Sequence, residues 1–126
     1  REGISDELLR LMDQGERDTA ANTGTTVYVA INYGGRQEIV QAVNRALQSG
    51  KREITMDDIS ANVYTVPDCD LVIRPSGEQR LSNFLLWQAA YSEFWYSDVL
   101  WPDFTEQDLA EALHAYENRN RRFGGR

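Results

Sequence analysis

The predicted fold rests on residues 69–104, CDLVIRPSGEQRLSNFLLWQAAYSEFWYSDVLWPDF. It opens with a short apolar strand at Leu71–Ile73 and breaks at Pro75-Ser76-Gly77. Polar residues then lead into an apolar run that predicts a helix from Leu81 onward, and an aromatic, strand-like segment follows from Phe94 to Trp101. Strand, turn, helix and strand in this order indicate a βαβ unit with parallel strands.

The turn after the first strand carries side chains that suit a phosphorylated ligand. Arg74 and Arg80 flank it and Ser82 follows, at a junction where we expect free backbone N–H groups. Guanidinium groups make permanently charged, bidentate contacts to phosphate oxygens. We therefore expect the turn to hold a diphosphate. The alternative is an ordinary loop with solvated arginines, because many α/β turns contain an arginine and a serine by chance.

The remaining segments also predict an α/β protein. Helices are expected from Ser5 towards residue 21, from residue 36 to a stop at Gly50, at residues 55–64 and from Thr105. A strand is expected at residues 25–31, TTVYVAI, because this run is β-branched and apolar on both faces. The helix predicted from Leu81 is apolar all round, which predicts burial in a core or against a partner subunit.

Both glycine-bearing turns, at residues 32–36 and 74–82, follow predicted strands. In a parallel sheet they would lie at the same carboxyl-end edge, where open α/β sheets bind ligands. Neither turn fits the G-x-G-x-x-G pattern of dinucleotide-binding folds or the Lys-Ser/Thr phosphate loop. A nucleotide fold of either kind is therefore not predicted.

Composition limits the function classes. The chain has 126 residues, enough for one domain, with 41% apolar residues and a net charge of −7 that argues against nonspecific nucleic-acid binding. The single cysteine, Cys69, cannot form an intrachain disulfide and fits a reducing compartment. No apolar run approaches the roughly 18 residues of a membrane-spanning helix, and the start has no signal-peptide pattern. We expect a cytoplasmic protein.

Several ordered motifs carry a resemblance to a known family. The run DLVIRPSGEQRLSNFLLWQAAYSE, the VLWPDF after it, the terminal RRFGG and the NYGGR turn resemble the C-terminal half of the cis-prenyltransferases, above all the bacterial undecaprenyl diphosphate synthases. The resemblance implies a parallel-sheet α/β fold of non-Rossmann type that forms a homodimer. It also implies an enzyme that uses Mg²⁺ and adds isopentenyl diphosphate in cis to an allylic diphosphate such as farnesyl diphosphate, making a polyprenyl diphosphate such as undecaprenyl diphosphate. Such an enzyme would meet membranes only through this lipid product.

The resemblance also implies site residues. Arg74, Arg80 and Ser82 match the positions that hold the diphosphate of isopentenyl diphosphate, and Glu93 matches the acidic position associated with Mg²⁺. Arg122 and Gly124 resemble an R-x-G element that reaches across the dimer towards the same diphosphate. The alternatives are a surface acid at Glu93 and a solvated basic tail.

The chain also departs from the family pattern. Pro75-Ser76 stands where Thr or a second Gly is more common, and Gln79 stands where some members carry His. The family's Asp-Gly-Asn turn, which supplies the catalytic aspartate, has no match in residues 1–126. We therefore expect the C-terminal part of a single domain, without the catalytic residue, that is inactive and aggregation-prone alone. The alternative is a non-catalytic subunit or interaction module of a two-subunit prenyltransferase.

Overall fold

The computed structural model describes residues 3–64 and 68–119. The chain divides into two compact units at the Tyr33–Gly34 junction. The first unit holds one helix and an extended segment, and the second holds the sheet and the remaining helices.

The first unit contains helix α1, Asp6–Thr19. Ser5 caps it, because the Leu8 amide donates to the Ser5 hydroxyl oxygen at 3.3 Å, as the sequence predicts. The strand predicted at residues 25–31 is wrong: the segment is assigned no strand, and Val27 and Val29 are 77% and 74% exposed. A strand needs a hydrogen-bonding neighbour, and no described residue forms a ladder with this segment despite its β-branched composition.

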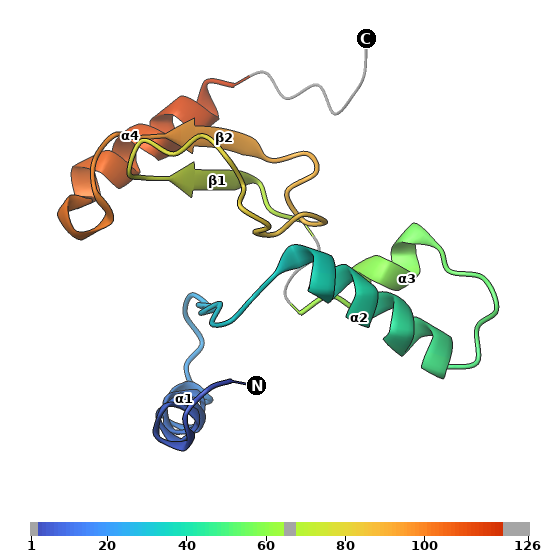
Figure 1. The fold of residues 1–126 in the computed structure, drawn as a ribbon. Coiled ribbons are helices and arrows are strands. Elements are labelled where there is room, and N and C mark those ends of the chain that lie inside the picture. The colour runs from blue at the N-terminus through green and yellow to red at the C-terminus, as the bar shows by residue number, and fades with distance from the viewer. Residues whose placement is uncertain (1–2, 65–67, 120–126) are drawn as a thin grey trace, which may run out of the picture. The chain divides into compact units, whose positions relative to one another are not determined.

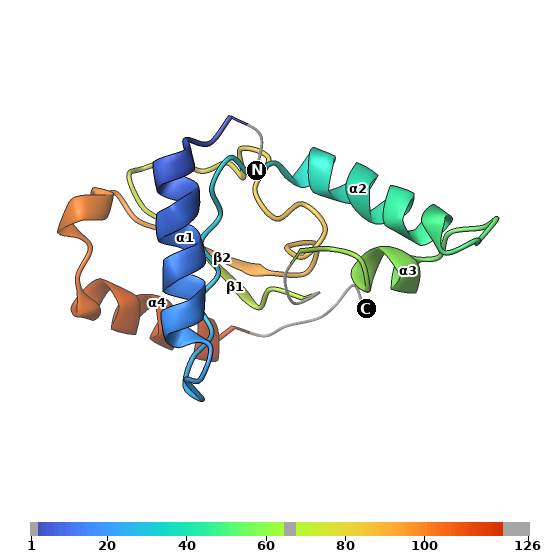
Figure 2. The ribbon, with the colours of Figure 1, turned by 90° about the horizontal axis from the view of Figure 1, so that it is seen from below.

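In the second unit, helices α2, Gly35–Gln48, and α3, Met56–Ser60, lie side by side (Figure 1), an arrangement also seen from below (Figure 2). The buried face of α2 repeats every four residues through Glu38, Ala42 and Ala46. Both helices were predicted, although α3 is shorter than residues 55–64.

The sheet consists of β1, Leu71–Arg74, and β2, Glu93–Tyr96, which run parallel. Leu71 pairs with Glu93 and Arg74 with Tyr96, so the predicted α/β class with parallel strands is confirmed. After β2 the chain forms a 3-10 turn at Trp101–Asp103 and then helix α4, Glu106–Glu117, which packs on β2 (Figure 1). Thr105 and Asp108 form a capping box at its start.

The helix predicted from Leu81 is wrong, because residues 82–91 form a series of turns. Ser82, Asn83 and Leu85 have φ angles of +49°, +66° and +45°, which a right-handed helix of L-residues cannot contain. Within this chain the segment is not buried on all sides, and burial against a partner subunit stays a prediction. Gln88 and Ala89 are buried, whereas Phe84 and Tyr91 are 39% and 67% exposed.

In the part of the chain that the structure describes, no helix is both long enough and apolar enough to cross a membrane.

Candidate functional site

The turn after β1 is hydrogen-bonded to the segment that follows β2. The amide of Ser76 donates to the carbonyl of Val99 at 2.8 Å, and the amide of Gly77 donates to the carbonyl of Ser97 at 2.9 Å. Ser76 and Gly77 both have a positive φ, of +72° and +71°. The expectation of free N–H groups in this turn is therefore wrong at these two residues.

The three predicted diphosphate ligands lie at the end of β1 and on the segment that connects β1 to β2. Arg74 is the half-buried last residue of β1, at the carboxyl end of the strand. Arg80 is exposed and its guanidinium forms an ion pair with Glu78. Ser82 is exposed in left-handed backbone conformation. The structure thus places one guanidinium group at the end of β1 and the second, together with the hydroxyl, on the segment that follows.

The second glycine turn meets the same connection. The Gly35 amide donates to the Asn83 carbonyl at 2.7 Å, and the Arg36 amide donates to the Asn83 side-chain oxygen at 2.9 Å. An open hollow of about 220 Å³ beside this contact is lined by Arg36, Asn83 and Leu86. Residues 34–36 therefore lie against the turns that begin at Ser82. The predicted shared sheet edge is wrong, because residues 32–36 follow no strand and the sheet of the described residues consists of β1 and β2.

A buried carboxylate on α2 contacts the segment that connects β1 to β2. Glu38 of α2 is 1% exposed and accepts hydrogen bonds from the Tyr64 amide at 2.7 Å and from the side-chain nitrogen of Gln88 at 3.1 Å. The main-chain carbonyl of Gln88 accepts a hydrogen bond from the amide of Cys69, just before β1, at 2.9 Å. This network joins α2, the chain after α3 and the entry to β1.

Glu93 lies away from Arg74. It pairs with Leu71 at the amino end of the strands, three residue steps or about 10 Å along the sheet from the Arg74–Tyr96 pair. Its carboxylate is 3.4 Å from an Arg119 guanidinium nitrogen. No group of three or more potential metal-ligating His, Cys, Asp or Glu residues occurs among residues 3–64 and 68–119. The described residues alone therefore do not fit a metal site, and Glu93 offers a single carboxylate.

Two other predicted site residues, Arg122 and Gly124, lie outside the described residues. The last described residue of this tail is Arg119, which contacts β2 through Glu93 and also donates to the Phe94 carbonyl at 3.4 Å. The start of the basic tail is therefore tied to the amino end of β2.

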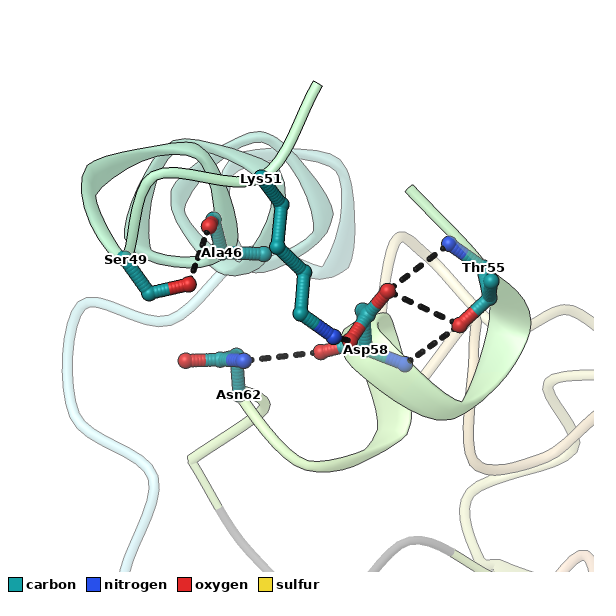
Figure 3. Close-up of polar contacts among 6 residues, drawn as sticks. All are labelled: Ala46, Ser49, Lys51, Thr55, Asp58 and Asn62. Atoms are coloured by element: carbon teal, nitrogen blue, oxygen red, sulfur yellow. Dashed lines mark hydrogen bonds and ion pairs between the residues drawn. The ribbon is translucent and has the colours of Figure 1, made fainter. Parts of the chain in front are cut away.

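A second polar cluster joins the loop after α2 to α3 (Figure 3). The Asp58 carboxylate forms an ion pair with Lys51 and accepts from the Thr55 amide and hydroxyl at 3.0 and 2.8 Å. The hydrogen bond from Lys51, followed by those from Thr55, lowers the pKa of Asp58 from 3.8 to about 2. This cluster caps α3 and has no contact with the arginine turn in the described contacts, so we assign it a structural role.

Sequence reasoning missed Asn83, Glu38 and Gln88. For Gln88 the available signal was a polar residue inside an otherwise apolar run, because a buried amide requires a hydrogen-bonding partner. Glu38 lies in a polar first helical turn and carries no such signal. The partners themselves lie 47 and 50 residues away in the sequence, which no local pattern reveals.

Comparison with known proteins defines the class as a prenyltransferase. Residues 1–124 match the family model described as "Putative undecaprenyl diphosphate synthase". The chain belongs to this family. Among curated relatives, an isoprenyl transferase of Fusobacterium nucleatum is 49% identical over 126 residues, covering 99% of this chain and 55% of the relative. An isoprenyl transferase of Clostridium perfringens is 53% identical over 115 residues, covering 85% of this chain and 46% of the relative.

Solved structures agree with this assignment. A probable undecaprenyl diphosphate synthase from Campylobacter jejuni matches with a TM-score of 0.90 and 32% identity, over 97% of this chain and 58% of that protein. Lavandulyl diphosphate synthase from Lavandula x intermedia, solved in complex with dimethylallyl diphosphate, matches with a TM-score of 0.90 and 36% identity, over 97% of this chain and 56% of that protein. The chain spans about half the length of the relatives that it matches.

Proposed function

We propose that the whole protein carrying this chain catalyses cis-prenyl chain elongation. It would condense isopentenyl diphosphate onto an allylic diphosphate, with farnesyl diphosphate as the expected starter and a polyprenyl diphosphate such as undecaprenyl diphosphate as the product. The family match over residues 1–124 supports this proposal. So does the relative from Lavandula, whose structure holds an allylic diphosphate.

The observation that carries the proposal for this part of the chain is the placement of Arg74, Arg80 and Ser82 on the connection leaving β1. We assign these residues to the diphosphate of isopentenyl diphosphate. Two permanent positive charges and a hydroxyl donor match the charge and the acceptors of a diphosphate. Their contribution to the reaction is to fix the position of the nucleophilic alkene and to neutralise its phosphate charge.

The ion pair that Arg80 forms with Glu78 is compatible with this assignment. This ion pair is exposed, with the arginine side chain 67% accessible. An exposed ion pair stabilises a protein by only about 0–1 kcal/mol. A diphosphate, which offers more charge and more acceptor oxygens, would therefore compete effectively for the guanidinium.

The proposal for the metal concerns one residue of this chain. We propose that Glu93 supplies one carboxylate linked to Mg²⁺, with the other ligands coming from outside the described residues. Mg²⁺ often keeps several waters and takes one or two carboxylates together with substrate phosphates, so one acid is compatible with this role. Arg119 is the competing partner of that carboxylate at 3.4 Å.

We also propose that this half contributes to a homodimer and that Arg122 and Gly124 reach the diphosphate of the second subunit. Several large apolar side chains around β2 and α4 are exposed, which supports an interface there. They are Tyr96, Leu100, Trp101, Leu109 and Leu113.

The test is to incubate the purified whole protein with farnesyl diphosphate, isopentenyl diphosphate and Mg²⁺, and to separate the products by chain length. The proposal expects products that grow by one five-carbon unit per condensation and that disappear when EDTA removes the metal. A folded protein that elongates no allylic diphosphate would contradict the proposal. Activity that appears only after a second, different subunit is added would favour the non-catalytic subunit.

A further inference from the structure

Asn83 contacts the start of α2 at two points. Its backbone carbonyl accepts from the Gly35 amide at 2.7 Å, and its side-chain oxygen accepts from the Arg36 amide at 2.9 Å. Gly35 and Arg36 are the first two residues of α2. The first amides of a helix have no partner inside it, so Asn83 caps α2 from 47 residues further along the chain.

The close contact with Asn83 and Leu86 leaves no room for a side chain at Gly34 or Gly35. A Cβ atom on Gly34 would lie 2.8 Å from the Asn83 side-chain nitrogen. One on Gly35 would lie 2.9 Å from Leu86 Cγ and 3.1 Å from the Asn83 carbonyl oxygen. Two consecutive glycines therefore allow the backbone of α2 to approach the 82–86 turns closely.

The backbone at this contact is itself unusual. Ser82 and Asn83 have φ angles of +49° and +66°, a conformation that Asn accepts more readily than most residues and Ser does not favour. Such conformations persist only where the surroundings hold them. The two bonds of Asn83 supply that constraint one residue away from Ser82.

We infer that Asn83 is a positioning residue of the diphosphate site: by clamping the 82–83 turn to the start of α2, it fixes Ser82 for its contact with the diphosphate of isopentenyl diphosphate. This inference rests on the proposed function. Asn83 also lines the hollow that Arg36 and Leu86 complete, so the clamp sets the distance between Arg36 and the turn.

The experiment compares Asn83→Gly and Asn83→Ala with the wild type in the whole protein. Glycine accepts the positive φ but removes the side-chain oxygen, whereas alanine removes the oxygen and also strains the backbone. Asn118→Ala is the control, because Asn118 is exposed at the end of α4 and its side chain bonds only to His114 in the described contacts. The readouts are KM for each of the two substrates, kcat, thermal stability and hydrogen exchange of the Arg36 amide.

If Asn83 positions Ser82, both Asn83 variants raise the KM for isopentenyl diphosphate by roughly tenfold, equivalent to about 1.4 kcal/mol. The KM for the allylic substrate stays within about twofold, and the Arg36 amide exchanges faster. Asn83→Ala should be less thermally stable than Asn83→Gly, because alanine also strains the backbone.

A glycine variant with wild-type KM values would overturn the inference, because it would show that only the backbone conformation matters. Arg80→Ala separates this failure from failure of the proposed function. If Arg80→Ala raises the KM for isopentenyl diphosphate and Asn83→Gly does not, the positioning role alone fails. If Arg80→Ala also leaves that KM unchanged, the diphosphate site itself fails and the inference fails with it.

Discussion

The side-chain nitrogen of Gln88 lies 3.1 Å from both carboxylate oxygens of Glu38. Gln88 is 3% exposed and Glu38 is 1% exposed. A carboxylate buried this deeply is tolerated only when donors surround it, and Gln88 and the Tyr64 amide are two such donors. The contact therefore links the stability of α2 to the conformation of the turns after Ser82.

Replacing Gln88 by Ala should lower the free energy of unfolding by about 1.5–3 kcal/mol, because it removes a donor and leaves the Glu38 carboxylate buried. The measurement is urea unfolding of the whole protein, followed by circular dichroism. Gln79→Ala is the control, since Gln79 is exposed and a surface change of this kind costs less than about 0.5 kcal/mol. Equal stability of the two variants would contradict this role of Gln88.

The Asp58 cluster should make the protein sensitive to acid. Because Lys51 and Thr55 lower the pKa of Asp58 from 3.8 to about 2, its stabilising effect is complete above about pH 4 and is lost as the pH falls towards 2. Carboxyl NMR titration should show Asp58 with a midpoint near 2 in the wild type and a higher midpoint in Lys51→Met. An unchanged midpoint in that variant would show that the Lys51 contact does not form in solution.

The same contact can be tested through unfolding. Asp58→Asn should be less stable than the wild type at pH 5, and the difference should shrink as the pH approaches 2. Asp57→Asn is the matched control, because Asp57 lies next in the chain and is exposed. A difference between Asp58→Asn and wild type that does not vary with pH would rule out the charge of Asp58 as its cause.

Gly77 and Gly15 should respond in opposite ways to replacement by Ala. Gly77 has a φ of +71°, and an added Cβ would lie 3.3 Å from a carboxylate oxygen of Asp98, so Gly77→Ala should destabilise by about 1 kcal/mol. Gly15 lies inside α1 with no atom within 4 Å of an added Cβ, so Gly15→Ala should stabilise by about 0.5–1 kcal/mol. Thermal unfolding of the two variants measures both effects, and destabilisation by both would contradict the α1 conformation.

The sequence predicted those elements whose signals are local. Helix starts at Ser5, Thr55 and Thr105 were found because a capping hydroxyl and nearby acids act within one turn. The parallel pairing of β1 and β2 was predicted from the order strand, turn, helix and strand, and it is confirmed although turns replace the predicted helix. The family resemblance was likewise readable from motifs and is confirmed by the match over residues 1–124.

The sequence failed where distant contacts override local preference. The run after Leu81 has helical composition, but Asn83 and Gln88 bond to α2 and the backbone adopts left-handed angles instead. The free amides expected at Ser76 and Gly77 are occupied by carbonyls from the chain after β2. Neither contact can be foreseen from residues within one turn or strand.

The roles of Arg74, Arg80, Ser82 and Glu93 stay predictions. Their positions are now known: the first three lie on the connection from β1, and Glu93 lies at the other end of the sheet beside Arg119. The motif gave these positions in the sequence. Only the strand register could show that Glu93 and Arg74 are separated along the sheet.

Steady-state kinetics of Arg80→Ala in the whole protein, with each substrate varied in turn, test the assignment of this turn to isopentenyl diphosphate. We expect at least a tenfold higher KM for isopentenyl diphosphate and a nearly unchanged KM for the allylic diphosphate, whereas Arg52→Ala, which replaces an exposed arginine outside the turn, behaves as wild type. An unchanged KM for isopentenyl diphosphate in Arg80→Ala would contradict the assignment of this turn to that substrate.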